Sequence, residues 1–234
     1  MTFNSKIFID ALFSGAFLKG ALLSVTLATL CQFFAVIIGF FLALARIGKN
    51  RISRGLAGLY IWFFRAIPAL LLLLIVWNVF PQLLPIFRSD WYSPFVAAFI
   101  ALSILEAAYM AEILRSSIMS VDDGQPLAAR ALGMTPSQVM RKVMLPQVTR
   151  IAIPPTANEY IGMIKYTSLA SVISLQELLT TAQNGVSTTF RYSEYYAAAL
   201  VYYLVIVSIL MLVQGRVEKK YAWISTKTKI VGKV

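Results

Sequence analysis

Long apolar runs separated by short clusters of charge form the main pattern along this chain. Three stretches contain no charged residue at all: 20–45, 66–87 and 195–215. A helix needs about 20 apolar residues to cross the roughly 30 Å hydrocarbon core of a bilayer. Each of the three stretches is therefore long enough to form a membrane-spanning helix.

Two further apolar stretches are interrupted by charged residues. The stretch 91–118 contains Glu106 and Glu112, and 151–174 contains Glu159 and Lys165. Counting both gives five predicted spans and an all-α integral membrane protein with a single transmembrane domain, residues 1–234. The predicted spans are at about 20–45, 58–85, 91–118, 148–175 and 195–215.

Composition supports a membrane protein. Hydrophobic residues make up 59% of the chain and charged residues only 13%, with a mean hydropathy of +0.75, whereas soluble domains have about 25% charged residues. Asp10 and Lys19 precede or interrupt the first apolar run, which is not the pattern of a cleavable signal peptide. We expect this run to be retained as the first span.

The basic residues indicate how the spans are oriented. Lys and Arg are enriched on the cytoplasmic side of membrane proteins. Only four fall on one side of the predicted spans, namely Lys6, Lys19, Arg88 and Arg191. The fifteen on the other side are Arg46, Lys49, Arg51, Arg54, Arg115, Arg130, Arg141, Lys142, Arg150, Arg216, Lys219, Lys220, Lys227, Lys229 and Lys233. This predicts an outside N-terminus and a cytoplasmic C-terminus, and the net charge of +11 needs no nucleic-acid partner.

Missing residue types exclude several kinds of active site. The chain has no histidine and one cysteine, Cys31, which excludes histidine-based metal sites, Ser-His-Asp triads, thiolate zinc clusters and an intrachain disulfide. It also lacks the G-x-x-x-x-G-K-[ST] phosphate-binding loop. We expect no enzymatic activity and no cofactor on this chain.

A punctuated polar segment, 119–146, lies between the third and fourth spans. Pro126 suits a first helical turn, and Gly133 suits the left-handed backbone that commonly ends a helix. Thr135 and Gln138 have the spacing of a capping box, and Pro146 is expected to end the second short helix. The pattern fits either an amphipathic interfacial loop or a rigid docking element for a soluble partner.

This segment resembles the cytoplasmic coupling motif of type I ABC importer permeases. The motif's Glu-Ala-Ala, Gly and closing Leu-Pro correspond to Leu127-Ala128-Ala129, Gly133 and Leu145-Pro146. The stretches "FFRAIPALL", "AAYMAEILRSSIMSVDDGQ" and "KYTSLASVISLQELL" resemble the polar amino acid uptake branch. Two departures are Leu127 in place of glutamate, and Lys165-Tyr166-Thr167 where the family usually has Lys-Asp-Thr.

The resemblance implies a bacterial cytoplasmic (inner) membrane protein that takes up a polar or charged amino acid. It implies three kinds of partner besides membrane lipid: a cytoplasmic ABC ATPase dimer, a second identical or paralogous permease, and an extracytoplasmic binding protein that delivers the substrate. ATP and Mg would be bound by the ATPase. The coupling residues implied are Leu127, Ala128, Ala129, Gly133, Leu145 and Pro146.

Charges within spans suggest a path for the substrate, because ionisable groups at membrane depth are costly and face protein or water. Pro154-Pro155 is expected to break the fourth span beside such groups, and broken helices commonly line cavities. The candidate path residues are Glu106, Asn158, Glu159, Lys165, Thr167 and Ser168. Pairing across helices is the alternative role for each.

Other charged and small residues have simpler interpretations. Arg65 is expected to reach the headgroups, and Glu112 and Arg115 to pair at spacing three. Gly39 and Ala43 either permit close helix packing or reflect ordinary membrane-helix composition. The alternative function is a proton-coupled carrier or channel subunit whose intramembrane carboxylates bind and release protons. A purely scaffolding protein is disfavoured, because it would not need polar groups at mid-depth.

Overall fold

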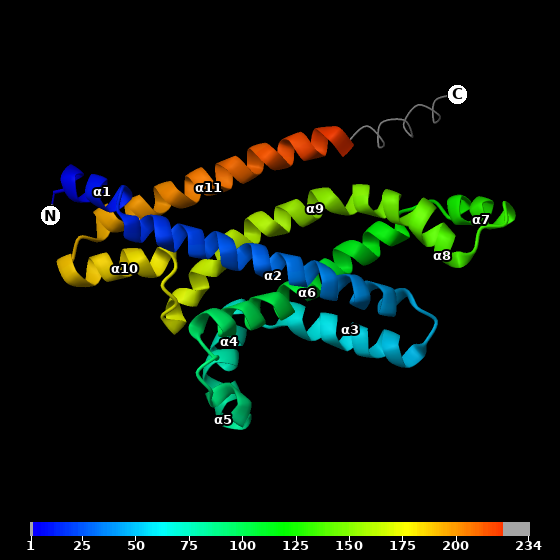
Figure 1. The fold of residues 1–234 in the computed structure, drawn as a ribbon, viewed down its shortest axis with the longest axis horizontal. Helices are drawn as coiled ribbons and strands as arrows, with labels where there is room; N and C mark the ends of the chain where they lie inside the picture. The colour runs from blue at the N-terminus through cyan, green and yellow to red at the C-terminus, as the bar shows by residue number, and fades with distance from the viewer. Residues whose placement is uncertain (1, 222–234) are drawn as a thin grey trace.

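The computed structural model describes residues 2–221, and this part of the chain is helical, without a strand. The helices form an elongated bundle (Figure 1). The N-terminus lies at one end with α1 (Ser5–Leu12) and α10 (Leu178–Thr189), and α7 (Gly124–Ala131) and α8 (Pro136–Val139) lie at the other. Of the basic cluster predicted at the C-terminus, Lys227, Lys229 and Lys233 fall outside the described residues.

The centre of the bundle is the contact between α2 (Gly15–Ile47) and α6 (Pro94–Met119). Small residues bring the two backbones together. A Cβ atom added to Gly39 would lie 2.7 Å from the Cβ of Met110 and 3.0 Å from the carbonyl oxygen of Ala107. The structure therefore supports close helix packing, rather than ordinary membrane-helix composition, as the explanation for the small residues in the first span.

The second predicted span is not one straight helix, which corrects the prediction for 58–85. It is divided between α3 (Arg51–Ala66) and α4 (Ala69–Leu74), and the chain bends by 103° between them. Pro68 causes the bend because proline disfavours helical backbone at the residue before it, and Ile67 has ψ 135°. The segment continues as η1 (Ile75–Val79, a π-helix), α5 (Phe80–Leu83) and η2 (Pro85–Arg88, a 3₁₀ helix).

The prediction that Pro146 ends a short helix is wrong. The chain passes from α8 through the π-helix η3 (Met140–Met144) into α9 (Leu145–Tyr166) without leaving helical structure. In η3 the Leu145 amide donates to the carbonyl of Met140, five residues back. This wider turn gives room for the proline ring at the start of α9.

The predicted break at Pro154-Pro155 is also wrong, because both prolines lie inside α9. Their fixed φ is compatible with a helix, although each removes a backbone hydrogen bond. Buried residues on both sides, such as Ala152 and Ile161, pack α9 against the bundle and offset this cost. The helix changes character only after Tyr166, where η4 (Thr167–Ile173) is a 3₁₀ helix.

Two elements that the hydrophobic pattern did not reveal close the N-terminal end. Helix α1 packs on α11 (Tyr192–Tyr221), and α10 packs on both α2 and α11. Among the described residues, α2, α6 and α11 are long and apolar enough to cross a membrane, and the bent pair α3–α4 would make a fourth span. The fourth predicted span, 148–175, corresponds to α9, and it stays a prediction.

Candidate functional site

The predicted coupling segment forms a small two-helix knob at one end of the bundle (Figure 1). Gly133 has φ +82° and ends α7 as expected. The capping box is present: the Thr135 amide donates to Gln138 Oε1 over 2.8 Å, and the Gln138 amide donates to Thr135 Oγ1 over 3.3 Å. The knob is therefore a locally stabilised structure.

The knob exposes apolar side chains. Leu127 is 63% exposed and Leu132 84% exposed, whereas Ala129 is buried. Leu145 and Pro146 lie at the start of α9, next to the knob, and Leu145 lines an open apolar groove of about 720 Å³ between α2 and α9. Ala128 and Gly133 are exposed. The structure thus brings together the residues predicted for coupling.

The residues predicted for the substrate path divide into two groups. Asn158, Glu159 and Lys165 lie on one side of α9, around Gly162. Asn158 and Lys165 are exposed, Glu159 is half-buried, and a Cβ added to Gly162 would meet open space. Within the described residues this polar face has no ion pair. It is open to a ligand or to another subunit.

Arg65 lies near this polar face. Its guanidinium stands 5.5 Å from the centre of the Tyr109 ring, and the two residues line an open pocket of about 360 Å³. Arg65 is close enough to Glu159 to act on it electrostatically. Glu112 and Arg115 pair as expected, with the guanidinium 2.8 Å from the carboxylate.

The other path candidates are enclosed or bonded locally. Thr167 is fully buried and donates to the carbonyl of Ile164 over 2.7 Å. Ser168, which is half-buried, donates to the carbonyl of Lys165. Glu106 is fully buried. Thr167 and Glu106 are therefore not exposed to an amino acid substrate in this conformation.

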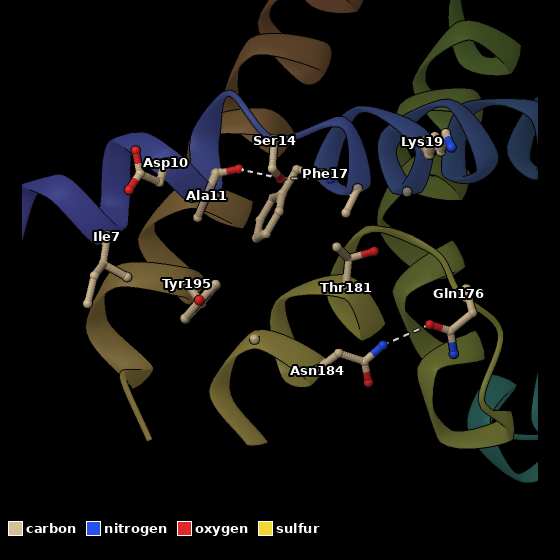
Figure 2. A pocket seen from close by; sticks show the side chains of 13 residues that line it. Ile7, Asp10, Ala11, Ser14, Phe17, Lys19, Gln176, Thr181, Asn184 and Tyr195 are labelled. Atoms are coloured by element: carbon tan, nitrogen blue, oxygen red, sulfur yellow. Dashed lines mark hydrogen bonds between the residues drawn. The ribbon is translucent and has the colours of Figure 1, made fainter. Parts of the chain in front are cut away.

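The N-terminal end holds a pocket with several polar side chains that sequence reasoning missed (Figure 2). It has a volume of about 560 Å³ and lies between α1, α2, α10 and α11. Figure 2 shows Asp10 and Lys19 on opposite sides of it, with Asn184 donating to Gln176 Oε1 over 2.8 Å. Its residues come from two distant parts of the sequence, 7–20 and 176–195, so no local pattern could have grouped them.

Glu177 is a second residue that sequence reasoning missed. It is fully buried and caps α10, accepting hydrogen bonds from the amides of Leu179 and Thr180 and from the Thr180 hydroxyl. Ser24 on α2 and Tyr203 on α11 also donate to it. Burial raises the pKa of the Glu177 carboxyl, and the hydrogen bonds at the α10 terminus oppose this. In the sequence, Glu177 stands just before a helix-forming run, and an acidic residue at that position is a signal for the start of a helix.

Comparison with known families identifies the chain. Residues 35–223 match the family described as "Binding-protein-dependent transport system inner membrane component". The chain belongs to this family of ABC importer permeases. It is thus a multi-pass membrane protein, as the apolar helices indicate.

Relatives of this permease carry amino acid transport names. It is 39% identical over 220 residues to the probable amino-acid ABC transporter permease YckA of Bacillus subtilis, covering 94% of each chain. It is 39% identical over 227 residues to the arginine transport permease ArgU of Corynebacterium glutamicum, covering 93% of this chain and 72% of that one. These similarities show an ABC importer membrane subunit for amino acids.

A solved structure supports the same assignment. The permease is similar to a chain of an amino acid ABC transporter crystallised with histidines, with a TM-score of 0.84 and 32% identity. The match covers 94% of this permease and all of that chain. A methionine transporter chain in an inward-facing conformation matches with a TM-score of 0.70 at 19% identity, which shows the fold alone.

Proposed function

We propose that this permease is the membrane subunit of an ATP-driven importer for a polar or charged amino acid. An extracytoplasmic binding protein delivers the substrate, a cytoplasmic ABC ATPase dimer supplies the energy from ATP and Mg, and a second permease completes the path. The N-terminus lies outside and the knob of α7 and α8 lies in the cytoplasm of a bacterial cell. Family membership and the relatives' names support this function over a proton-coupled carrier.

The exposed knob is the observation that carries the docking part of this proposal. Leucines that are 63% and 84% exposed on a short helix leave apolar surface facing water unless a protein covers it. The capping box and the left-handed Gly133 hold the two helices at a defined angle. A rigid projection of this kind can transmit the motion of an ATPase to α6 and α9, which flank it.

Gly133→Pro tests the docking role. Proline fixes φ near −65°, whereas Gly133 has φ +82°, so the substitution must change the chain direction between α7 and α8. We expect normal membrane insertion and loss of co-purification with the ATPase, and the same from deletion of 126–133. Gly15→Pro is the matched control, because Gly15 opens α2 at the far end of the molecule, where proline is tolerated.

Normal assembly of the Gly133→Pro protein with the ATPase would refute the docking role. Inhibition of uptake by vanadate, but not by collapse of the proton gradient, is the expected result that separates the importer from the proton-coupled carrier. The reverse pattern would support the carrier.

The polar face of α9 is the proposed substrate contact. A carboxylate at Glu159 complements the ammonium of an amino acid, and Lys165 complements its carboxylate. Asn158 supplies neutral hydrogen bonds on the same face, and Ser168 follows in η4. Thr167 and Glu106 are buried in this conformation, so we assign them to the layer of side chains beneath this surface.

Glu159→Gln and Lys165→Met test the contact. Each removes a hydrogen bond to a charged group, worth about 1.5–3 kcal/mol, so uptake efficiency should fall by about 10- to 150-fold. Glu218→Gln is the control, because Glu218 is an exposed carboxylate near the end of α11. Wild-type uptake and selectivity in both path variants would refute the assignment without affecting the docking role.

A further inference from the structure

Three residues at the centre of the bundle carry buried oxygens that have no hydrogen-bond partner. Within the described residues, the unpartnered buried side-chain atoms are Gln32 Oε1, Ser103 Oγ and both carboxylate oxygens of Glu106. These residues are 8%, 4% and 0% exposed. Buried polar atoms in proteins almost always have a partner, so four oxygens without one in the same region indicate that something else binds them.

The contacts between α2 and α6 show that the three residues are neighbours. Cys31 Sγ lies 3.8 Å from the carbonyl oxygen of Phe99, and Gly39 packs against Met110. Ser103 and Glu106 are both close enough to the Cys31 thiol to act on it, and Gln32 follows Cys31 in α2. Glu106 follows Ser103 by three residues and so lies one turn further on the same side of α6.

The side chain of Gln32 runs along this part of α6. Its Nε2 donates to Met110 Sδ over 3.1 Å, and Met110 is one turn beyond Glu106. Because the amide nitrogen is engaged there, the amide oxygen is the group left for another ligand. The unpartnered atoms of the cluster are therefore all oxygens, from an amide, a hydroxyl and a carboxylate, and the Cys31 thiol lies beside them.

An ionised carboxylate buried without a counter-charge is too costly to persist in a membrane helix. The Glu159 carboxylate is close enough to act on Glu106 electrostatically and adds to the negative potential there. Either a proton or a positive group must therefore neutralise Glu106, and the unpartnered oxygens around it are suitable ligands for a positive group. Hard cations prefer amide, hydroxyl and carboxylate oxygens, and a single carboxylate is neutralised by a single positive charge.

We propose that the contact between α2 and α6 holds a small monovalent cation, bound by Glu106, Gln32 and Ser103. Each oxygen of the site is buried, and α2 and α6 pack closely beside it, which favours an ion over an amino acid. The ion neutralises Glu106 and ties α2 to α6. This inference is independent of the ATPase, the binding protein and the transported substrate.

Thermal unfolding of the purified full-length permease in detergent tests the site, with Na⁺ and K⁺ as probes and N-methylglucamine replacing them at constant ionic strength. We expect Na⁺ to raise the Tm saturably. Glu106→Gln should abolish this dependence, and Ser103→Ala should raise the half-saturating Na⁺ concentration by about tenfold or more, because it removes one ligand of a charged group.

Glu112→Gln is the matched control. It makes the same chemical change on the same helix, but Glu112 is half-buried and bonded to Arg115, so its Na⁺ dependence should equal that of the wild type. If Glu106→Gln does not fold, equilibrium binding of radioactive Na⁺ to the wild type and to Ser103→Ala decides the question. We expect about one ion per wild-type chain and weaker binding to Ser103→Ala.

Identical unfolding of the wild type in Na⁺, K⁺ and N-methylglucamine, with no bound radioactive Na⁺, would overturn the proposal. A stability that depends on pH but not on the cation, and loses that dependence in Glu106→Gln, would show a proton on Glu106 in place of the ion. Neither result would affect the assignment as a permease.

Discussion

Replacing Gly39 with alanine tests how closely α2 and α6 must approach. The new Cβ would lie 2.7 Å from the Cβ of Met110, 2.9 Å from the amide nitrogen of Ala111 and 3.0 Å from the carbonyl oxygen of Ala107. Two of these atoms belong to the α6 backbone, which cannot move aside without shifting the helix. Overpacking of this kind costs about 1–3 kcal/mol.

The matched control is Gly162→Ala in α9, where the added Cβ meets nothing within 4 Å. Both variants gain about 1 kcal/mol from the higher helix propensity of alanine. The difference between the two variants therefore isolates the clash, at about 1–3 kcal/mol. For a chain of this length each kcal/mol changes the Tm by about 2–4 °C.

We expect the Tm of Gly39→Ala in detergent to be roughly 2–12 °C below that of Gly162→Ala. The measurement is thermal unfolding of the two purified variants side by side, followed by intrinsic fluorescence. Equal Tm values would show that α2 and α6 have room between them at Gly39, and would refute the close packing.

Three other substitutions test local features. Thr135→Ala removes the cap of α8 and should cost about 1 kcal/mol, seen as roughly fivefold faster hydrogen exchange at the Gln138 amide; unchanged exchange would argue against the capping box. Gly185→Val adds carbon atoms that would overlap the ring of Tyr195, and it should destabilise the permease by about 1–3 kcal/mol. Adding Tyr195→Ala to this variant should restore part of the lost stability. Burial raises the pKa of the Glu177 carboxyl, so its protonated form favours the folded state. The stability of the wild type relative to Glu177→Gln should therefore fall as the pH rises above the ordinary glutamate pKa of about 4.3. Parallel stability curves for the two proteins from pH 4 to pH 8 would contradict this.

Local signals in the sequence predicted local structure well. Thr135 and Gln138 predicted a capping box, Gly133 predicted a left-handed helix end, and Glu112 and Arg115 predicted a pair at spacing three; all are confirmed. Each feature depends on residues within one or two turns. Neighbouring side chains and backbone groups are sufficient to produce them.

Proline positions were predicted less well because neighbouring structure decides their outcome. Pro68 produces a bend of 103°, whereas Pro146 follows a π-turn and Pro154-Pro155 stay inside a continuous helix. All four lie in or beside apolar sequence, so the pattern alone does not distinguish them. Packing of the flanking residues determines whether the helix continues.

By itself, the sequence determined the apolar helices, the knob and its caps, because spans follow from hydropathy and caps from adjacent residues. Tertiary structure decided which charges are exposed and which are enclosed. Asn158 and Lys165 are on an open face of α9, whereas Glu106 and Glu177 are buried among residues from other helices. The physical reason is that burial and hydrogen bonding of these groups depend on partners far away in the chain, whose positions only the packing of the helices establishes.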